Sequence, residues 1–437
     1  MSANELTFTT SKIRSRSVAW YDQLISIIIP ISLYFCFTNY YYISALGALT
    51  VVLLPFFAGK KNFRLQPIAR RILISLMFFL LLCIISSLVV NPLQLISFDF
   101  YRRDGNIFIS YLPLVVLICT AIDFNIWKII KRFIYITTIF NIAAMGIHFI
   151  SHPHPEYWML FTAHNAAGGF LGIVCIVNFA YLCKCKYKSI PLLCLLINLF
   201  GLYLTNSRGS IFPLIGAFIF LFVLRILKLR NFDIVVNVLI FIVMFSFVYF
   251  VAGVRGTDAF VHLSSFNIPP EFAGGVVDRL LSSIGRGGTI VDRLYYLYPR
   301  AIEMFRLSPL FGTGMGTFND INYNFEGLEN IYYLNLSTTP IYSDSHAHNS
   351  FFHIMAENGL VGLSLIVILI ICIRNYALKL NDRNLSNIIY LSINFIVLTS
   401  FFEHRLFTPS EILPFVYILG MIISKENFAK KEALANA

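Results

Sequence analysis

The chain has 437 residues, of which 58% are hydrophobic and only 13% are charged. A soluble domain carries about a quarter charged residues, so this composition leaves too little polar surface and excludes a soluble globular protein. The formal net charge of +11 does not by itself indicate nucleic-acid binding, because the cytoplasmic loops of membrane proteins also collect Lys and Arg.

Apolar blocks long enough to cross a hydrocarbon core of about 30 Å recur along the chain. Each is expected to be helical, because lipid cannot satisfy an open backbone amide. The sequence therefore predicts an all-α, polytopic membrane bundle of about twelve transmembrane helices. The first two blocks are poorly separated and alternatively form a re-entrant pair. The predicted spans are 24–42, 43–59, 72–91, 107–122, 133–151, 158–182, 189–205, 210–227, 233–252, 353–373, 386–402 and 409–424.

Basic residues fall mainly in alternate loops, and the loops that hold lysine are expected on the cytoplasmic side together with both termini. The opposite loops hold arginine and no lysine. Arginine presents a planar fork that matches phosphate and carboxylate groups, so this side is favoured for binding such anions. The arginines of these loops are Arg102, Arg103, Arg208, Arg255, Arg279, Arg286, Arg293, Arg300, Arg306 and Arg405.

One segment, 253–349, breaks the pattern of short loops and is predicted to be a long, partly helical periplasmic loop that folds against the bundle. Long loops in compact proteins are usually functional. The chain thus divides into spans one to nine (1–252), the loop domain, and spans ten to twelve with a cytoplasmic tail (350–437). Within the loop, residues 288–307 are predicted to form a helix that Pro299 kinks or interrupts.

Three groups of residues on the predicted exported side have the chemistry of a site. Arg208 lies in the short turn TNSRGS (205–210), where a charge is functional or else an anchor that reaches for the interface. The long loop carries Arg286, Arg293 and Arg300, for which the alternative is a solvated helix face.

The third group is the histidines of the sequence DSHAHNSFFH, in which Asn349 follows His348. One histidine acting as a general base is favoured, since its ordinary pKa of about 6.5 suits proton transfer near neutrality. The alternatives are a metal site formed by Asp344, His346 and His348, which their spacing before a helix disfavours, and polar residues at an interface.

No Asp or Glu falls in the middle of a predicted span. This argues against an ion-coupled transporter but leaves a passive flippase open. Arginines at the membrane boundary suit a lipid-linked pyrophosphate, and a nearby histidine suits activation of a sugar hydroxyl. The arginines and the histidine together indicate an enzyme that transfers a sugar from a lipid diphosphate.

Several motifs resemble the O-antigen ligase family. His348-Asn349, Gly359 and Gly362 stand at the spacing of the family signature. The segment SPLFGTGMGTF (308–318), the TNSRGS turn and the tripeptide Asp292-Arg293-Leu294 are similar to other segments of that family. The resemblance covers roughly residues 160–375 and the overall topology, and the first four spans carry no matching motif.

The resemblance implies a GT-C-like membrane glycosyltransferase of lipopolysaccharide biosynthesis, in the bacterial inner membrane. It implies transfer of glycan from undecaprenyl pyrophosphate to lipid A-core on the periplasmic face, with inversion and with neither metal nor cofactor. By carry-over, His348 is the base, with His346 as the alternative, and Arg208 and Arg293 bind the pyrophosphate. We expect Arg286, Arg300, Asn349 and His346 to contribute to substrate binding.

Two other functions stay open. An O-antigen polymerase shares the architecture and the donor but joins lipid-linked repeat units. A non-catalytic lipid-oligosaccharide flippase is the third and weakest alternative.

Overall fold

The fold is a bundle of helices, and over the described part of the chain all regular secondary structure is helical. Seven of the described helices are long and apolar enough to cross a membrane, which confirms a polytopic helical membrane protein. The predicted number of about twelve spans and the division into three parts stay predictions. The computed structural model describes residues 65–90, 106–151, 156–159, 161, 163–254, 293, 297–318, 346–407 and 409–435, and isolated residues between 27 and 53.

Predicted spans from residue 72 onward each fall on a helix, whereas 24–42 and 43–59 lie almost wholly outside the described residues. The largest shift of a helix start is in the third of these helices, which begins at Ile126 instead of residue 133 because its charged first turns continue the helix toward the lysine-rich end. The last helix continues to Ala435, beyond the predicted end at residue 424. The helices are α3 (Pro67–Val90), α4 (Asn106–Ile118), α5 (Ile126–Ser151), α6 (His164–Lys184), α7 (Ser189–Leu204), α8 (Arg208–Phe222) with the π-helical turn η3 (Val223–Leu227), α9 (Phe232–Val254), α13 (Tyr298–Leu307), α14 (Ser350–Lys379), α15 (Arg383–Ser400) and α16 (Pro409–Ala435).

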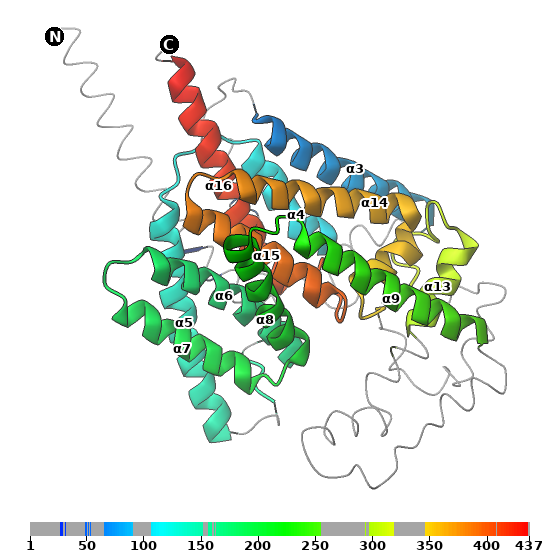
Figure 1. Cartoon of the computed structure of the whole chain (residues 1–437), viewed down its shortest axis with the longest axis horizontal. Helices are drawn as coiled ribbons and strands as arrows, with labels where there is room; N and C mark the ends of the chain where they lie inside the picture. Colours follow the sequence, from blue (N-terminus) through cyan, green and yellow to red (C-terminus); the bar gives the residue numbers. More distant parts are fainter. Residues whose placement is uncertain are drawn as a thin grey trace.

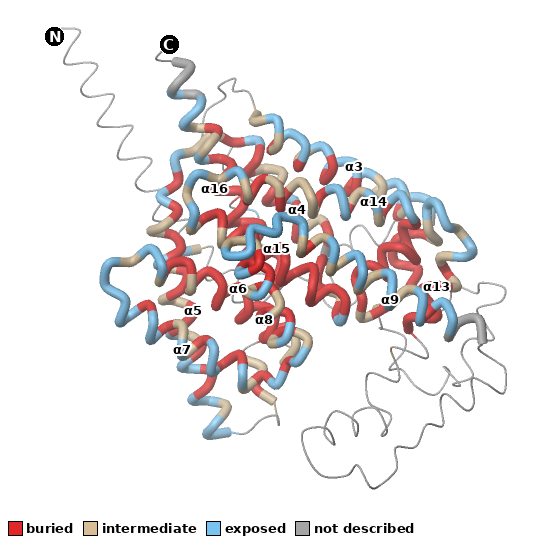
Figure 2. The backbone as a smooth tube through the Cα atoms, viewed as in Figure 1, coloured by how far each residue is buried: buried red, intermediate tan, exposed pale blue. Residues whose placement is uncertain are grey.

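Helix α6 lies at the centre of the bundle and is buried on nearly every side. It packs against α5, α7, α8, α15 and α16 (Figure 1). Small residues permit this close packing, since a Cβ at Gly172 would overlap the Phe395 ring of α15. Figure 2 shows buried backbone concentrated in the centre and exposed stretches on outer helices such as α3, α7 and α9, as expected where lipid covers the surface.

The two ends of the bundle differ in charge. At one end of the bundle, basic side chains join neighbouring helices. Lys425 of α16 donates to the carbonyl of Phe124, just before α5 (3.1 Å). Arg374 of α14 donates through Nε to Oδ2 of Asp233 on α9 (2.6 Å). At the opposite end lie the starts of α6, α8 and α14 and the 401–407 segment that joins α15 to α16. The lysine-bearing loops therefore gather at the end opposite the histidine segment.

Described parts of the long loop pack on the bundle. Helix α13 lies against α9 and α14 (Figure 1), and it shares a hydrophobic cluster with residues such as Phe318, Ala347 and Phe352. Most of the predicted 288–307 helix before Tyr298 lies outside the described residues, so a kink or interruption at Pro299 stays a prediction. Helix α13 begins at Tyr298, so Pro299 stands in its first turn, where a missing amide hydrogen has no helical partner to lose.

The glycine-rich turn after α13 binds the backbone of α14 where that helix is interrupted. Gly359 has a φ of 63° inside α14, which frees peptide groups on both sides of it. Thr313 donates its amide hydrogen to the carbonyl of Ala356 (2.9 Å), and Leu360 and Val361 donate to the carbonyls of Pro309 (2.9 Å) and Leu310 (3.1 Å). The turn thus supplies partners that a broken helix would otherwise lack.

Substituting Gly359 with Ala should destabilise the protein by about 3 kcal/mol, because the left-handed φ and the overlap of a Cβ with the Leu310 backbone both oppose a side chain. Thermal unfolding of the detergent-solubilised protein measures this loss. Gly146→Ala on α5 is the matched control, since a Cβ there has nothing within 4 Å. Equal melting temperatures for the two variants would contradict the assignment.

Candidate active site

The centre of the candidate site is the carboxylate of Glu403, in the segment between α15 and α16. Its Oε1 lies 2.7 Å from Nη2 of Arg293, and its Oε2 lies 2.9 Å from Nδ1 of His348. Arg293 also donates through Nη1 to the carbonyl of Phe402 (2.7 Å). The structure thus brings together two predicted site residues that are far apart in sequence, and joins them through a residue that sequence analysis did not identify.

Glu403 is ionised in this setting. Burial alone would raise the pKa of its carboxyl, but the Arg293 guanidinium and the His348 ring together hold that pKa well below its usual range. Nδ1 of His348 lies 2.9 Å from this carboxylate, which only accepts hydrogen bonds, and 3.2 Å from Nη2 of Arg293, which only donates. The shorter contact favours a proton on Nδ1, and this tautomer leaves Nε2 as the basic ring nitrogen. Nε2 makes no hydrogen bond to any residue that the structure describes, and the His348 side chain is 27% exposed.

The backbone at His348 is held in an unusual conformation. Its φ is 49°, a left-handed value that costs a non-glycine residue about 1–2 kcal/mol. Its amide donates to Nδ1 of His346 (3.1 Å), and its carbonyl accepts from the Tyr298 hydroxyl (3.4 Å). Strain of this kind gathers at functional sites, and here it orients the imidazole toward Glu403.

Asn349 and Ser350 tie the start of α14 to the 401–407 segment. The Asn349 side chain caps α14 by accepting from the amides of Phe351 and Phe352, and it donates to the carbonyl of Phe401 (3.1 Å). The Ser350 hydroxyl donates to the carbonyl of Glu403 (3.2 Å). Asn349 is fully buried, so the geometry gives it a supporting role and leaves its predicted substrate contact untested.

Arg405 anchors the same segment inside the bundle. Its amide donates to the Ser350 hydroxyl (2.8 Å), and its guanidinium Nε lies 3.4 Å from Oε2 of Glu411 on α16. The other Glu411 oxygen accepts from the Thr399 hydroxyl (2.6 Å). The Arg405 charge also helps to keep Glu403 ionised, so the anchor affects the electrostatics of the site as well as its shape.

Arg208 stands at the edge of this cluster as the first residue of α8, with its side chain exposed. The preceding Ser207 donates to Oδ1 of Asn165 (3.0 Å), and Nδ2 of Asn165 donates to Oε1 of Glu403 (3.2 Å). A Cβ at Gly209 would lie 3.4 Å from Cγ of Glu403. The turn that carries Arg208 is therefore fixed directly beside the Arg293–Glu403–His348 cluster.

The remaining predicted site residues lie in different surroundings. Arg300 is only 8% exposed, and its guanidinium carbon lies 4.7 Å from the centre of the Phe318 ring, so it also supports the packing of α13. Arg286 lies outside the described residues, as does Asp344. Groups of three or more His, Cys, Asp or Glu side chains that could hold a metal ion are absent from the described part of the chain.

His346 belongs to a stack of histidine rings beside the cluster. Its ring centroid is 4.2 Å from that of His348 and 5.0 Å from that of His404. Burial, followed by the neighbouring histidines and Arg293, lowers the pKa of His346 well below its ordinary value. Its Nδ1 already accepts from the His348 amide, which keeps that nitrogen unprotonated.

The residues that sequence analysis missed are Glu403 and Asn165. The signal available for Glu403 was its position, because it is an acidic residue directly before a histidine and an arginine (His404 and Arg405) in a very short segment between two predicted spans. Asn165 carries no such signal, since a lone amide at the start of an apolar helix is common.

A comparison with protein families matches residues 193–367 to the family described as O-antigen ligase, which confirms the predicted resemblance. The matched region contains Arg208, Arg293 and His348, and ends before Glu403. A match to this family indicates an enzyme of the O-antigen ligase or polymerase type in a multi-pass bacterial membrane protein. A comparison with curated proteins gives no match.

Replacing Glu403 by Gln should destabilise the protein at pH 7 by about 3 kcal/mol, because the partly buried Arg293 side chain, 15% exposed, then loses its counter-charge. Because the pKa of the Glu403 carboxyl is lower in the folded than in the unfolded protein, its ionisation stabilises the fold at pH values above the ordinary Glu pKa of about 4.3. This stabilisation is lost as the pH falls toward the pKa of the folded state. The difference in melting temperature between wild type and variant should therefore shrink below about pH 4.

Glu432→Gln, at an exposed position of α16, is the control for loss of one negative charge and should melt like the wild type. A Glu403→Gln protein as stable as the wild type at pH 7 would show that the carboxylate does not hold the cluster together.

Proposed function

We propose that this chain is an O-antigen ligase that transfers glycan from undecaprenyl pyrophosphate to a sugar hydroxyl of lipid A-core. The reaction takes place at the periplasmic face of the bacterial inner membrane, both chain termini are cytoplasmic, and neither metal nor cofactor takes part. The observation that carries the proposal is the Arg293–Glu403–His348 cluster beside the exposed Arg208, at the end of the bundle opposite the lysine-bearing loops.

In this proposal His348 is the general base. Nδ1–H is held by Glu403 at 2.9 Å, so Nε2 accepts the proton of the acceptor hydroxyl as its oxygen attacks the anomeric carbon. The buried carboxylate orients the ring and stabilises the imidazolium that forms, the part that an acidic residue also plays in other histidine-based sites. His346 is the weaker candidate, because its lowered pKa and its occupied Nδ1 make it a poor base.

The arginines bind the diphosphate in this proposal. As the acceptor oxygen bonds to the anomeric carbon, the bond to the diphosphate breaks and negative charge grows on the departing group. Arg208, exposed beside the cluster, and Arg293, held in a fixed direction by Glu403 and Phe402, suit that charge. Donors fixed in advance stabilise developing charge without reorganising, and guanidinium groups bind phosphate through paired hydrogen bonds.

Deletion of the gene in the bacterium that carries it distinguishes a ligase from a polymerase. We expect lipopolysaccharide gels to show lipid A-core without O-antigen, while long polymer accumulates on its lipid carrier. A core that bears a single repeat unit would instead identify a polymerase. Complementation with His348→Ala should restore no product although the protein inserts, whereas His346→Ala should restore a substantial part. Normal export by His348→Ala would favour a flippase.

Arg208→Lys should lower transfer at least tenfold, because lysine keeps the charge but loses the bidentate fork. The measurement is product formation by the purified variant from a lipid-linked glycan. Arg230→Lys, an exposed arginine at the opposite end of the bundle, is the matched control and should transfer normally. Near-normal transfer by Arg208→Lys would contradict the assignment of pyrophosphate binding to Arg208.

A further inference from the structure

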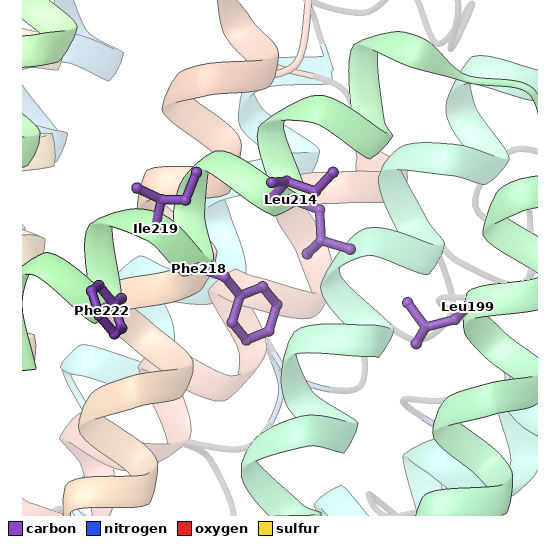
Figure 3. A pocket seen from close by; sticks show the side chains of 6 residues that line it. Leu199, Leu214, Phe218, Ile219 and Phe222 are labelled. Atoms are coloured by element: carbon purple, nitrogen blue, oxygen red, sulfur yellow. The ribbon is translucent and has the colours of Figure 1, made fainter.

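An apolar groove runs between α7 and α8 on the outside of the bundle. It has a volume of about 430 Å³ and is lined by Leu199 of α7 and by Leu214, Ile215, Phe218, Ile219 and Phe222 of α8. In Figure 3 the α8 side chains form one wall, and Leu199 faces them from the neighbouring helix. The volume lies within the range of small-molecule sites, about 300–1,000 Å³.

The groove exists because α7 and α8 both pack on α6. Phe218 stacks edge-on against Phe179 of α6, with ring centres 5.0 Å apart, and this pair closes the groove toward the core. The other side of α8 packs on α15, where a Cβ at Gly216 would lie 2.9 Å from Leu398. The lining positions 214, 215, 218, 219 and 222 recur at helical spacing and form one continuous stripe.

The groove leads away from Arg208 along the same helix. Leu214 lies about 9 Å along the helix axis from Arg208, and the stripe continues for about another 12 Å to Phe222. Leu199 lies at a comparable depth, because α7 and α8 form a hairpin whose short turn ends at Arg208. A guanidinium at the head of an apolar channel matches a ligand with an anionic head and a long hydrocarbon tail.

We infer that this groove holds the first part of the polyprenyl chain of the lipid diphosphate donor, whose diphosphate lies at Arg208. The inference rests on the proposed function and extends it to the lipid portion of the substrate. Bilayer lipid is as apolar as leucine, so the groove adds little transfer free energy. It acts by shape: branched and aromatic side chains pack against the methyl-bearing chain and keep the diphosphate aligned with His348.

Kinetics with two donors tests the groove. Both donors carry the same glycan diphosphate, one on a long polyprenyl chain and the other on a short, water-soluble prenyl chain. Ile215→Trp should fill the groove and lower kcat/KM about tenfold for the long-chain donor, through lost packing of the chain. The short-chain donor should react unchanged. Val243→Trp, at a 66% exposed position of α9 that does not line the groove, should affect neither donor.

An equal effect of Ile215→Trp on both donors, or no effect on either, would overturn the groove assignment. A second measurement needs no activity. A photo-reactive residue at position 219 should label a radioactive polyprenyl diphosphate without glycan in phosphatidylethanolamine vesicles, and unlabelled polyprenyl diphosphate should compete.

The same residue at position 243, on the exposed face of α9, is the control and should label weakly. Labelling of phosphatidylethanolamine that the diphosphate does not displace would show a general lipid crevice and overturn the inference. Specific labelling by a wild-type protein that transfers no glycan would support the groove and reject the proposed enzymatic function.

Discussion

A buried carboxylate constrains the geometry of the whole candidate site. Glu403 is 6% exposed, and an ionised carboxylate in such surroundings is tolerated only with partners that offset its lost hydration. Its partners come from three directions: Arg293 before α13, His348 before α14, and Asn165 at the start of α6. These segments must meet for the charge to be compensated, so the site forms only when the last helices have packed on the earlier ones.

The same end of the bundle contains non-helical backbone, which a membrane protein tolerates only where other protein groups satisfy it. The break in α14 at Gly359 meets this condition through the turn that follows α13. Two of the sequence motifs, the glycine-rich turn and the glycine of the histidine signature, are therefore two halves of one backbone arrangement. His348 lies just before this arrangement, and its position depends on it.

Much of the architecture could be predicted from the sequence, because a membrane span is a local property that composition and length reveal. The pairing of Arg293 with His348 was reachable from residue chemistry and family resemblance. Glu403 was not, since it lies 110 residues from Arg293 and hydrophobic periodicity says nothing about such distant contacts. Asn349 was predicted from its place in the family signature and Arg300 from its residue type. Neither kind of signal can separate a substrate ligand from a helix cap or a cation stacked on Phe318.

The hydrogen bonds between the turn and α14 run from backbone to backbone, so they do not depend on which side chains flank them. They hold residues 308–314 against residues 356–361, and Phe318 and Ala347 belong to one hydrophobic cluster. The chain between positions 318 and 346 therefore leaves and returns at neighbouring, fixed points. A doubling of its length adds only about 0.6 kcal/mol of closure entropy. The anchoring of these two ends therefore does not depend on the length of the chain that joins them.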